Sequence, residues 1–432
     1  MSALDALQKN ATRLTARITE AVSESTRGTF GPPSDALLDG EINLAAVRKQ
    51  LDSRASDGER LQAMRALIGA VSKGRNVSAL FPDVVKNVVA QSIEVRKLVY
   101  IFLIRHAEQE PDLALLSVNT FQKDLADPSP LIRAMALRVL SSIRVPMIAS
   151  IVTLAIRKAS SDTSPYVRKV AALAIPKCYR LDPAQHGPLL AILTPMLADR
   201  SPLAVGCVAT AFNELCPDRL DLLHPHFRRL AKLLVDADEW GQVVLTDLLA
   251  RYARTMLAKP TADDIDPDVQ LLLSSADPLF GSRNPAVVLA AARVYTFVAP
   301  QTHAYLAKPI QPLLRLLHLP PEPRAAALAT LGLIARDQPQ VLAPHFHRFF
   351  VRTASDPPRV AQDKLRILTA LAVHSPEYAP SLLAELEEYT RCAQPAVVRA
   401  SVDAVGRIAG TVQECSGQCV SMLMRFIGDS YS

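Results

Sequence analysis

Two short histidine motifs are the best candidates in this chain for metal binding, judged by residue type and spacing. They are His224-Pro-His226 and His345-Phe-His347, and each brings two imidazoles together. A structural zinc site needs four ligands, and neither motif has a cysteine or a second histidine pair close to it in the sequence. The simpler interpretation is that both motifs are versions of one helix start. We therefore expect no metal site and no cofactor.

Other catalytic arrangements are absent from the sequence. The segment Arg27-Gly-Thr-Phe-Gly31 lacks the lysine of a phosphate-binding loop, and no His-Glu-x-x-His motif occurs. No Cys-x-x-Cys pair occurs among the cysteines, which are Cys178, Cys207, Cys216, Cys392, Cys415 and Cys419. Unpaired, scattered cysteines are typical of a reduced, intracellular protein. Because no set of polar groups converges, we expect that this protein is not an enzyme.

A degenerate phrase, a turn followed by an apolar helix with a basic residue near its start, recurs about every 37 residues. Its clearest copies begin Leu125-Ala-Asp-Pro-Ser-Pro-Leu-Ile-Arg133, Ser161-Asp-Thr-Ser-Pro-Tyr-Val-Arg168 and Leu197-Ala-Asp-Arg-Ser-Pro-Leu-Ala-Val205. Proline suits the first turn of a helix, and Asp or Ser just before it can cap the free amides. Weaker copies start near residues 56, 91, 236, 282, 320, 355 and 393.

Each turn lies between two amphipathic helices, one before it and one after it. After the turn that begins at Leu125, for example, Ile132, Met135, Ala136 and Val139 follow helical spacing. Two short helices cannot bury both apolar faces alone, but stacked pairs share one continuous core. The sequence therefore predicts an all-α solenoid, a HEAT/armadillo-like stack of about ten helix pairs forming a curved superhelix.

The pairing of a turn aspartate with a helix arginine resembles HEAT repeats, in which such residues form a ladder between neighbouring units. Asp127 with Arg133, and Asp162 with Arg168, match this pattern. The next repeat has Asp199 without a matching arginine, so the sequence predicts a break in the ladder there.

Positive charge is concentrated in one part of the chain. The formal net charge is +6, and between Lys123 and Arg180 basic residues greatly outnumber Asp124, Asp127 and Asp162. This excess indicates either a face for anionic lipid or an acidic partner, or ladder arginines among solvated ones. The residues of the candidate basic face are Lys123, Arg138, Arg144, Arg157, Lys158 and Lys169.

The chain divides into three parts. Residues 1–24 carry apolar residues at near-heptad spacing and predict an amphipathic helix that packs on a partner, caps the solenoid or lies on a membrane. Residues 25–42 are rich in turn formers and predict a flexible linker. Residues 43–432 form the repeat region, and its last helical pattern continues almost to Ser432 without a polar cap, so we expect it to be incomplete at the C-terminus.

Several long phrases inside the repeats resemble beta adaptins. They include Gly74-Arg-Asn-Val-Ser-Ala-Leu-Phe-Pro-Asp-Val-Val-Lys-Asn87, Arg96-Lys-Leu-Val-Tyr100 and the segment from Pro111 to Phe121. Two further phrases, Leu140-Ser-Ser-Ile-Arg-Val-Pro146 and Glu239-Trp-Gly-Gln-Val-Val244, are most similar to the beta chains of the third adaptor complex. The resemblance covers residue 43 to the end and implies an adaptin trunk.

What the resemblance implies is a scaffold subunit of a heterotetrameric adaptor, assembled with a second large chain, a medium chain and a small chain. Such complexes sort cargo from Golgi and endosomes to the lysosome or vacuole. They are cytoplasmic and peripheral on trans-Golgi and endosomal membranes, to which an Arf-family GTPase in its GTP form recruits them. In related beta adaptins that GTPase contacts an early helix, which Pro111–Lys123 matches here. Leu115 and Val118 stand at the corresponding positions, three residues apart and so on one face.

Two alternatives remain at the level of the sequence. A stand-alone helical-repeat binding scaffold or transport receptor would show the same periodicity. Helical repeats can also read RNA, but that requires regularly placed polar and stacking side chains, and aromatic residues form only 5% of this chain. We therefore expect protein partners and no nucleic acid.

Overall fold

The computed structural model describes residues 44–52 and 55–430, so the predicted helix 1–24 and linker 25–42 lie outside the described residues. The described residues are helical and contain no strand. Their contacts divide the chain into two compact units, one extending to Ala155 and one starting at Ile156. The all-α solenoid class that the sequence predicts is confirmed.

All ten turns that the sequence indicates are followed by a helix. These helices, which we call the inner helices, are α4 (Asp57–Ser72), α6 (Ile93–His106), α8 (Pro130–Leu140), α10 (Pro165–Leu181), α12 (Pro202–Leu215), α14 (Glu239–Met256), α16 (Pro285–Phe297), α19 (Pro321–Asp337), α20 (Pro358–His374) and α22 (Pro395–Thr411).

The helices that precede the turns are shorter and more irregular. They are α3 (Leu44–Gln50), α5 (Phe81–Val85), α7 (Pro111–Asp124), α9 (Ala149–Ser160), α11 (His186–Met196), α13 (Phe227–Leu233), α15 (Pro267–Ala276), α17 (His303–Leu306), α18 (Ile310–Leu316), α21 (Ala379–Thr390) and α23 (Ser416–Ser430). Short 3₁₀ turns precede or follow several of these helices, and between α19 and α20 they stand in place of one. They are η1 (Ser78–Leu80), η2 (Lys86–Val89), η3 (Pro146–Ile148), η4 (Pro183–Gln185), η5 (Leu220–Leu223), η6 (Asp277–Gly281), η7 (Pro339–Val341), η8 (Ala343–Phe349), η9 (Pro376–Tyr378) and η10 (Gln413–Cys415).

The turn before an inner helix is built in the same way in three successive repeats. The carboxylates of Asp127, Asp162 and Asp199 each accept a hydrogen bond from the backbone N–H of the serine two residues later, at 2.7, 2.8 and 2.9 Å. Proline follows the serine as the first helical residue, where its missing N–H costs no intrahelical bond. The side chain therefore closes the turn and the proline starts the helix.

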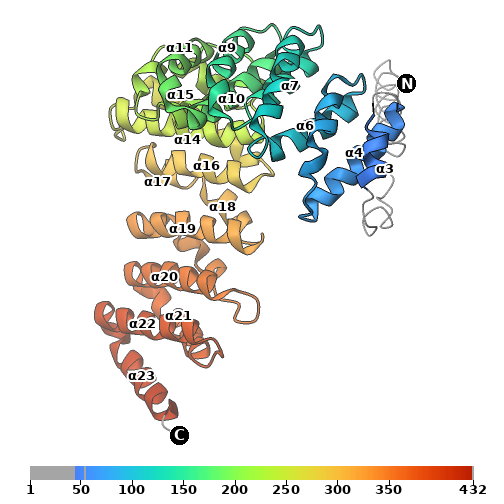
Figure 1. Cartoon of the computed structure of the whole chain (residues 1–432). Coiled ribbons are helices and arrows are strands. Elements are labelled where there is room, and N and C mark those ends of the chain that lie inside the picture. The colour runs from blue at the N-terminus through green and yellow to red at the C-terminus, as the bar shows by residue number, and fades with distance from the viewer. Residues whose placement is uncertain (1–43, 53–54, 431–432) are drawn as a thin grey trace, which may run out of the picture. The chain divides into compact units, whose positions relative to one another are not determined.

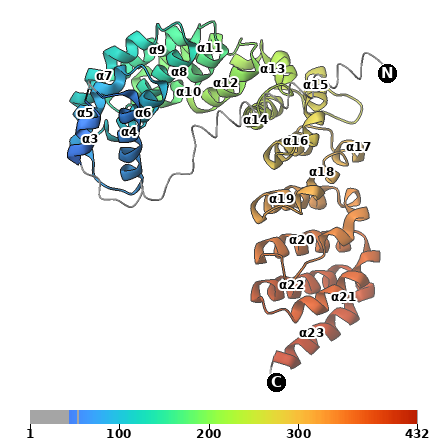
Figure 2. The ribbon, with the colours of Figure 1, turned by 90° about the vertical axis from the view of Figure 1, so that its right-hand side faces the viewer.

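In the unit that extends to Ala155, aromatic side chains form much of the core. Phe81, Phe102 and Phe121 are completely buried, and the rings of Phe81 and Phe102 lie 6.2 Å apart. Tyr100 meets Phe121 edge to face at 5.4 Å. Helix α4 packs on α6, and α5 contacts both α6 and α7 (Figure 2).

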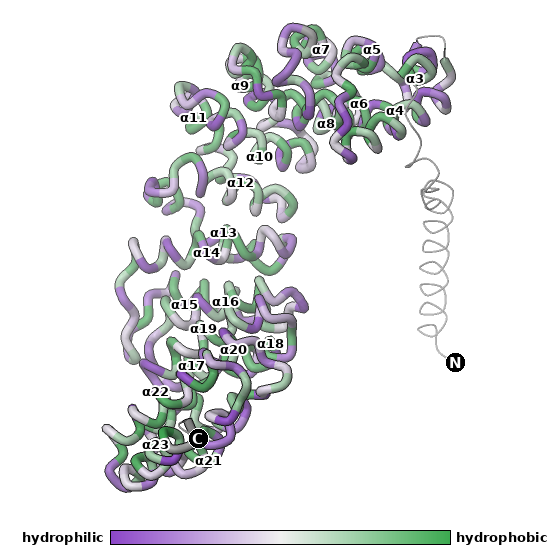
Figure 3. Tube along the Cα trace, turned by 60° about the horizontal axis from the view of Figure 1, so that its bottom comes forward, coloured by the Kyte–Doolittle hydropathy of each residue, from purple (hydrophilic) through white to green (hydrophobic). Residues whose placement is uncertain are grey.

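In the unit that starts at Ile156, the inner helices form a stack in which each contacts the next. Figure 1 shows α16, α19, α20 and α22 one after another in this stack. Figure 3 shows hydrophobic and hydrophilic residues interspersed along the helices. The apolar side faces the neighbouring helices, so burial depends on the presence of the adjacent repeats.

Two glycines allow a close approach of α12 and α14 within this stack. Gly206 in α12 and Gly241 in α14 face each other, and a Cβ added at Gly206 would lie well inside van der Waals contact of the Gly241 Cα. A Cβ added at Gly241 would also lie 2.7 Å from the capping carboxylate of Asp238. Only residues without a side chain permit this crossing.

We predict that Gly206→Ala lowers the free energy of unfolding by about 1–3 kcal/mol, because the new methyl group must push α12 and α14 apart. Urea unfolding followed by circular dichroism measures the change. Gly406→Ala is the matched control, since Gly406 also lies inside a helix but a Cβ there meets nothing within 4 Å. The control should gain up to about 1 kcal/mol from lower backbone entropy. Equal stability of wild type and Gly206→Ala would contradict the close crossing.

Candidate functional site

The candidate site residues fall into three groups: the predicted ladder, the predicted basic face and helix α7. The ladder arginines first hold their own turn. Arg133 donates to the carbonyl oxygens of Asp127 at 2.8 Å and Pro128 at 2.9 Å, and Arg168 donates in the same way to Asp162 and Thr163. Each arginine therefore binds the backbone carbonyl oxygen of its own turn aspartate.

Arg168 also reaches the next repeat. Its Nε and Nη2 donate to the two carboxylate oxygens of Asp199 at 2.6 and 3.1 Å, and the Asp199 side chain is only 6% exposed. Burial alone would raise the pKa of Asp199, but hydrogen bonds from Arg168 and from the Ser201 backbone lower it below its usual value. The aspartate that lacks an arginine of its own is thus bound by the arginine of the preceding repeat.

The repeat after Asp199 is joined to the preceding ones by a different ion pair. Val205 stands where the repeat would place an arginine, and no guanidinium extends from there to the following repeat. Instead Lys169, one residue after Arg168, donates to Asp238 at 3.0 Å. Asp238 is the N-cap of α14 and also accepts from the Gly241 N–H. The arginine ladder therefore includes Asp199 and ends after it, where Val205 replaces the next arginine. The ion pair of Lys169 with Asp238 connects to the following repeat.

A buried ionic cluster near the end of the described chain repeats the ladder geometry. Asp356 is 4% exposed and accepts from Arg324 at 3.0 Å and from Lys364 at 2.7 Å. The oxygen that binds Lys364, Oδ2 of Asp356, also accepts a hydrogen bond from the backbone N–H of Arg352. The sequence analysis did not select these residues, although Arg324 and Asp356 both belong to weak copies of the repeat phrase and have nearly the spacing of Arg168 and Asp199.

The residues of the predicted basic face have different surroundings. Arg144 is paired with Glu108 at 3.3 Å, and Lys169 is paired with Asp238, so both charges are compensated locally. For the others no ion pair occurs among the described residues, and all of them are exposed: Lys123 on α7, Arg138 on α8, and Arg157 and Lys158 on α9. Four of the six predicted residues thus carry uncompensated charge.

Helix α7 does not present Leu115 and Val118 as one open face. Val118 is only 5% exposed and lies on the core side with Ala114 and Phe121, while Leu115 is half-buried. The apolar side chain that is open to solvent is Leu116, at 67% exposure. The reason is helical spacing, because positions 114, 118 and 121 share the face that packs inward.

The histidines of both motifs contact other residues of the chain. His224 contacts the hydroxyl of Tyr252, burial lowers the pKa of His226, and His347 packs on Phe350. Nowhere in the described residues do three or more histidine, cysteine, aspartate or glutamate side chains gather as metal ligands would.

Trp240, near the start of α14, is also a residue whose sequence position suggests a structural role. An aromatic residue at a helix start usually packs between repeats, but the Trp240 side chain is 79% exposed. Among the described helices, none combines the length and the apolar character that crossing a bilayer requires.

Comparison with known proteins places these features in a family. Residues 41–432 match the family described as the adaptin N terminal region. The chain is 40% identical over 96% of its length to AP-3 complex subunit beta-1 of Canis lupus familiaris, of which it covers 40%. It is 39% identical over 89% of its length to AP-3 complex subunit beta of Dictyostelium discoideum, of which it covers 38%. The chain spans about 40% of the length of these relatives.

The fold is also similar to a chain of the structure titled "Homology model of the full-length AP-3 complex in an intermediate open conformation". The match has a TM-score of 0.62 at 27% identity and covers 98% of this chain and 74% of that chain.

We predict that Asp199→Asn lowers the free energy of unfolding by about 2 kcal/mol at pH 7, because it weakens a charge-assisted pair with Arg168. The pKa of Asp199 is lowered in the folded protein, so its charge stabilises the fold above the unfolded pKa of about 3.9 and this contribution is lost as the pH falls. Urea unfolding of both proteins at pH 7 and near pH 3 should show the difference shrinking in acid.

The matched control is Asp221→Asn, which removes an exposed carboxylate paired with Arg219 two residues away. It should change stability little at either pH. An Asp199→Asn defect of the same size at both pH values would show that the Arg168 pair is not the cause.

Proposed function

Because the chain belongs to the adaptin family, we propose that it is the N-terminal trunk of the beta subunit of an AP-3-type adaptor complex. In this role it acts as a non-enzymatic scaffold in vesicle-mediated transport, where cargo is sorted from Golgi and endosomes to the lysosome or vacuole. The observation that carries the proposal is 40% identity to an AP-3 beta subunit along 96% of the chain. The partners of the scaffold are a second large chain, a medium chain and a small chain.

The physical character of the chain agrees with a scaffold. Its buried residues are used to join one repeat to the next, and its buried charges, such as Asp199 and Asp356, are matched by partners within the chain. Binding surfaces on such a stack are formed by the exposed residues of successive helices. A function in assembly therefore requires no reactive cluster.

Recruitment is proposed at helix α7 and at the uncompensated basic residues. An Arf-family GTPase in its GTP form would contact Leu115 and Leu116, which are apolar side chains of α7 that are at least partly open. Val118 would support this contact from the core. Lys123, Arg138, Arg157 and Lys158 would attract the anionic cytoplasmic surface of trans-Golgi and endosomal membranes.

We predict that this chain, co-expressed with the other three adaptor subunits of its own organism, elutes as one complex. Size-exclusion chromatography with light scattering measures the mass of the assembly. The reason is that a trunk with this family's repeat pattern should expose the surfaces that its partner subunits bind. A well-behaved monomer that associates with none of the three subunits would contradict the proposal and favour a stand-alone helical-repeat receptor.

A second prediction concerns recruitment. Leu116→Asp should weaken capture of the assembled complex by the GTP-loaded GTPase about tenfold, because a carboxylate replaces an exposed apolar contact. Leu115→Asp should act in the same direction. Leu203→Asp is the control, since Leu203 is also an exposed leucine, at 40%, but lies on α12. Equal capture of all three variants would exclude α7 as the contact.

A further inference from the structure

A groove runs between the inner helices α20 and α22. Two adjoining cavities of about 170 and 480 Å³ form it, and they share Arg366, Thr369 and Arg407. Gln362 and Arg399 line the smaller cavity, and the exposed backbone of α22 lines the larger one. The groove lies on the packed pair α20 and α22, so its walls are helical and fixed.

Three arginines line this groove, and two of them form no ion pair among the described residues. Arg366 is paired with Asp363 at 3.1 Å, one turn away on its own helix. Arg399 and Arg407 are exposed, and neither guanidinium has an ion pair or hydrogen bond among the described residues. Asp403 is the acidic residue of the groove, and its position between Arg399 and Arg407 places all three on one helix face.

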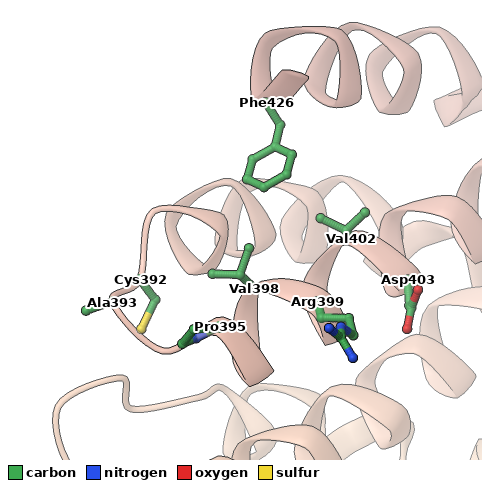
Figure 4. Close-up of a pocket in the computed structure, with 8 residues that line it drawn as sticks. All are labelled: Cys392, Ala393, Pro395, Val398, Arg399, Val402, Asp403 and Phe426. Atoms are coloured by element: carbon green, nitrogen blue, oxygen red, sulfur yellow. The ribbon is translucent and has the colours of Figure 1, made fainter. Parts of the chain in front are cut away.

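These arginines differ from those that hold the repeats together. Arg168 and Arg324 are largely buried and bind the carboxylates of Asp199 and Asp356. Arg399 and Asp403 line the smaller cavity, and Figure 4 shows both side chains directed away from Phe426. A guanidinium without a structural partner retains all its donors for a ligand.

Two glycines open the groove to a polypeptide backbone. Gly406 and Gly410 line the larger cavity, and a Cβ at either position would meet nothing within 4 Å. No side chain of α22 therefore fills the space above these two glycines, and a ligand backbone can approach the helix there. Val373 is 38% exposed at the rim and offers an apolar contact beside the charges.

We propose that the groove between α20 and α22 binds an acidic peptide segment of a partner protein, whose carboxylates pair with Arg399 and Arg407. Arginine binds carboxylates through paired N–H donors, and the net positive charge of the groove favours an acidic ligand. Asp403 adds an acceptor for a peptide N–H. A flat bilayer surface fits this recessed site less well, because the cavities lie between two helices.

The test is fluorescence anisotropy with the full chain and a fluorescein-labelled eight-residue peptide of alternating glutamate and glycine. The same peptide with glutamine in place of glutamate is the ligand control. The chain should bind the glutamate peptide and not the glutamine peptide. The double variant Arg399→Gln/Arg407→Gln should raise the Kd about tenfold or more, since two charge-assisted contacts are lost.

The matched protein control is Arg391→Gln/Arg425→Gln. Both of these arginines are exposed, both pair with Glu387 at 3.2 Å, and the net charge changes by the same amount. Its Kd should stay within about twofold of the wild type, and circular dichroism should show all variants folded. An equal loss in both double variants would mean diffuse charge attraction and would overturn the proposal.

Two other results would also overturn it. One is the absence of binding to the glutamate peptide. The other is binding of phosphatidylserine vesicles that depends on Arg399 and Arg407 while the peptide is ignored, because the ligand would then be a membrane. The assay uses this chain alone, so its outcome is independent of assembly into an adaptor complex.

Discussion

Every other feature of this structure depends on one constraint, which is that no helix pair in the chain can bury its apolar faces by itself. From α10 to α22 each inner helix packs against the inner helix of the next repeat, and this sets how closely those repeats must approach. The contact of Gly206 with Gly241 is the extreme case, because side chains there would separate α12 from α14. Stability therefore resides in the interfaces between repeats.

Charged residues in such a stack serve two distinct purposes. Where the side chain lies between repeats, as in Arg168 with Asp199 or Arg324 with Asp356, a charge is removed from water and must be matched within the chain. Where the side chain lies on the surface, as at Arg399 and Arg407, no internal partner is required. Sorting arginines by their partners thus separates residues that maintain the fold from those available for binding.

The same distinction applies to the adaptin trunk as a scaffold. A stack that uses its buried residues for repeat contacts leaves exposed side chains on successive helices to define its partners. Leu116, with Lys123 on the same helix, belongs to this available set, whereas Val118 belongs to the core. Related chains can consequently keep one architecture while their exposed residues change.

The sequence by itself determined the repeat frame. The turn phrases predicted the start of every inner helix, because proline, serine and aspartate act on the backbone within a few residues. It also indicated the family through long matching phrases. Contacts between repeats required the tertiary structure: the pairing of Arg168 with Asp199, the lysine bridge to Asp238, the inward position of Val118 and the exposure of Trp240. These depend on how adjacent helices cross and rotate, and the interactions that set this are made between residues some thirty to seventy positions apart, beyond the reach of local patterns.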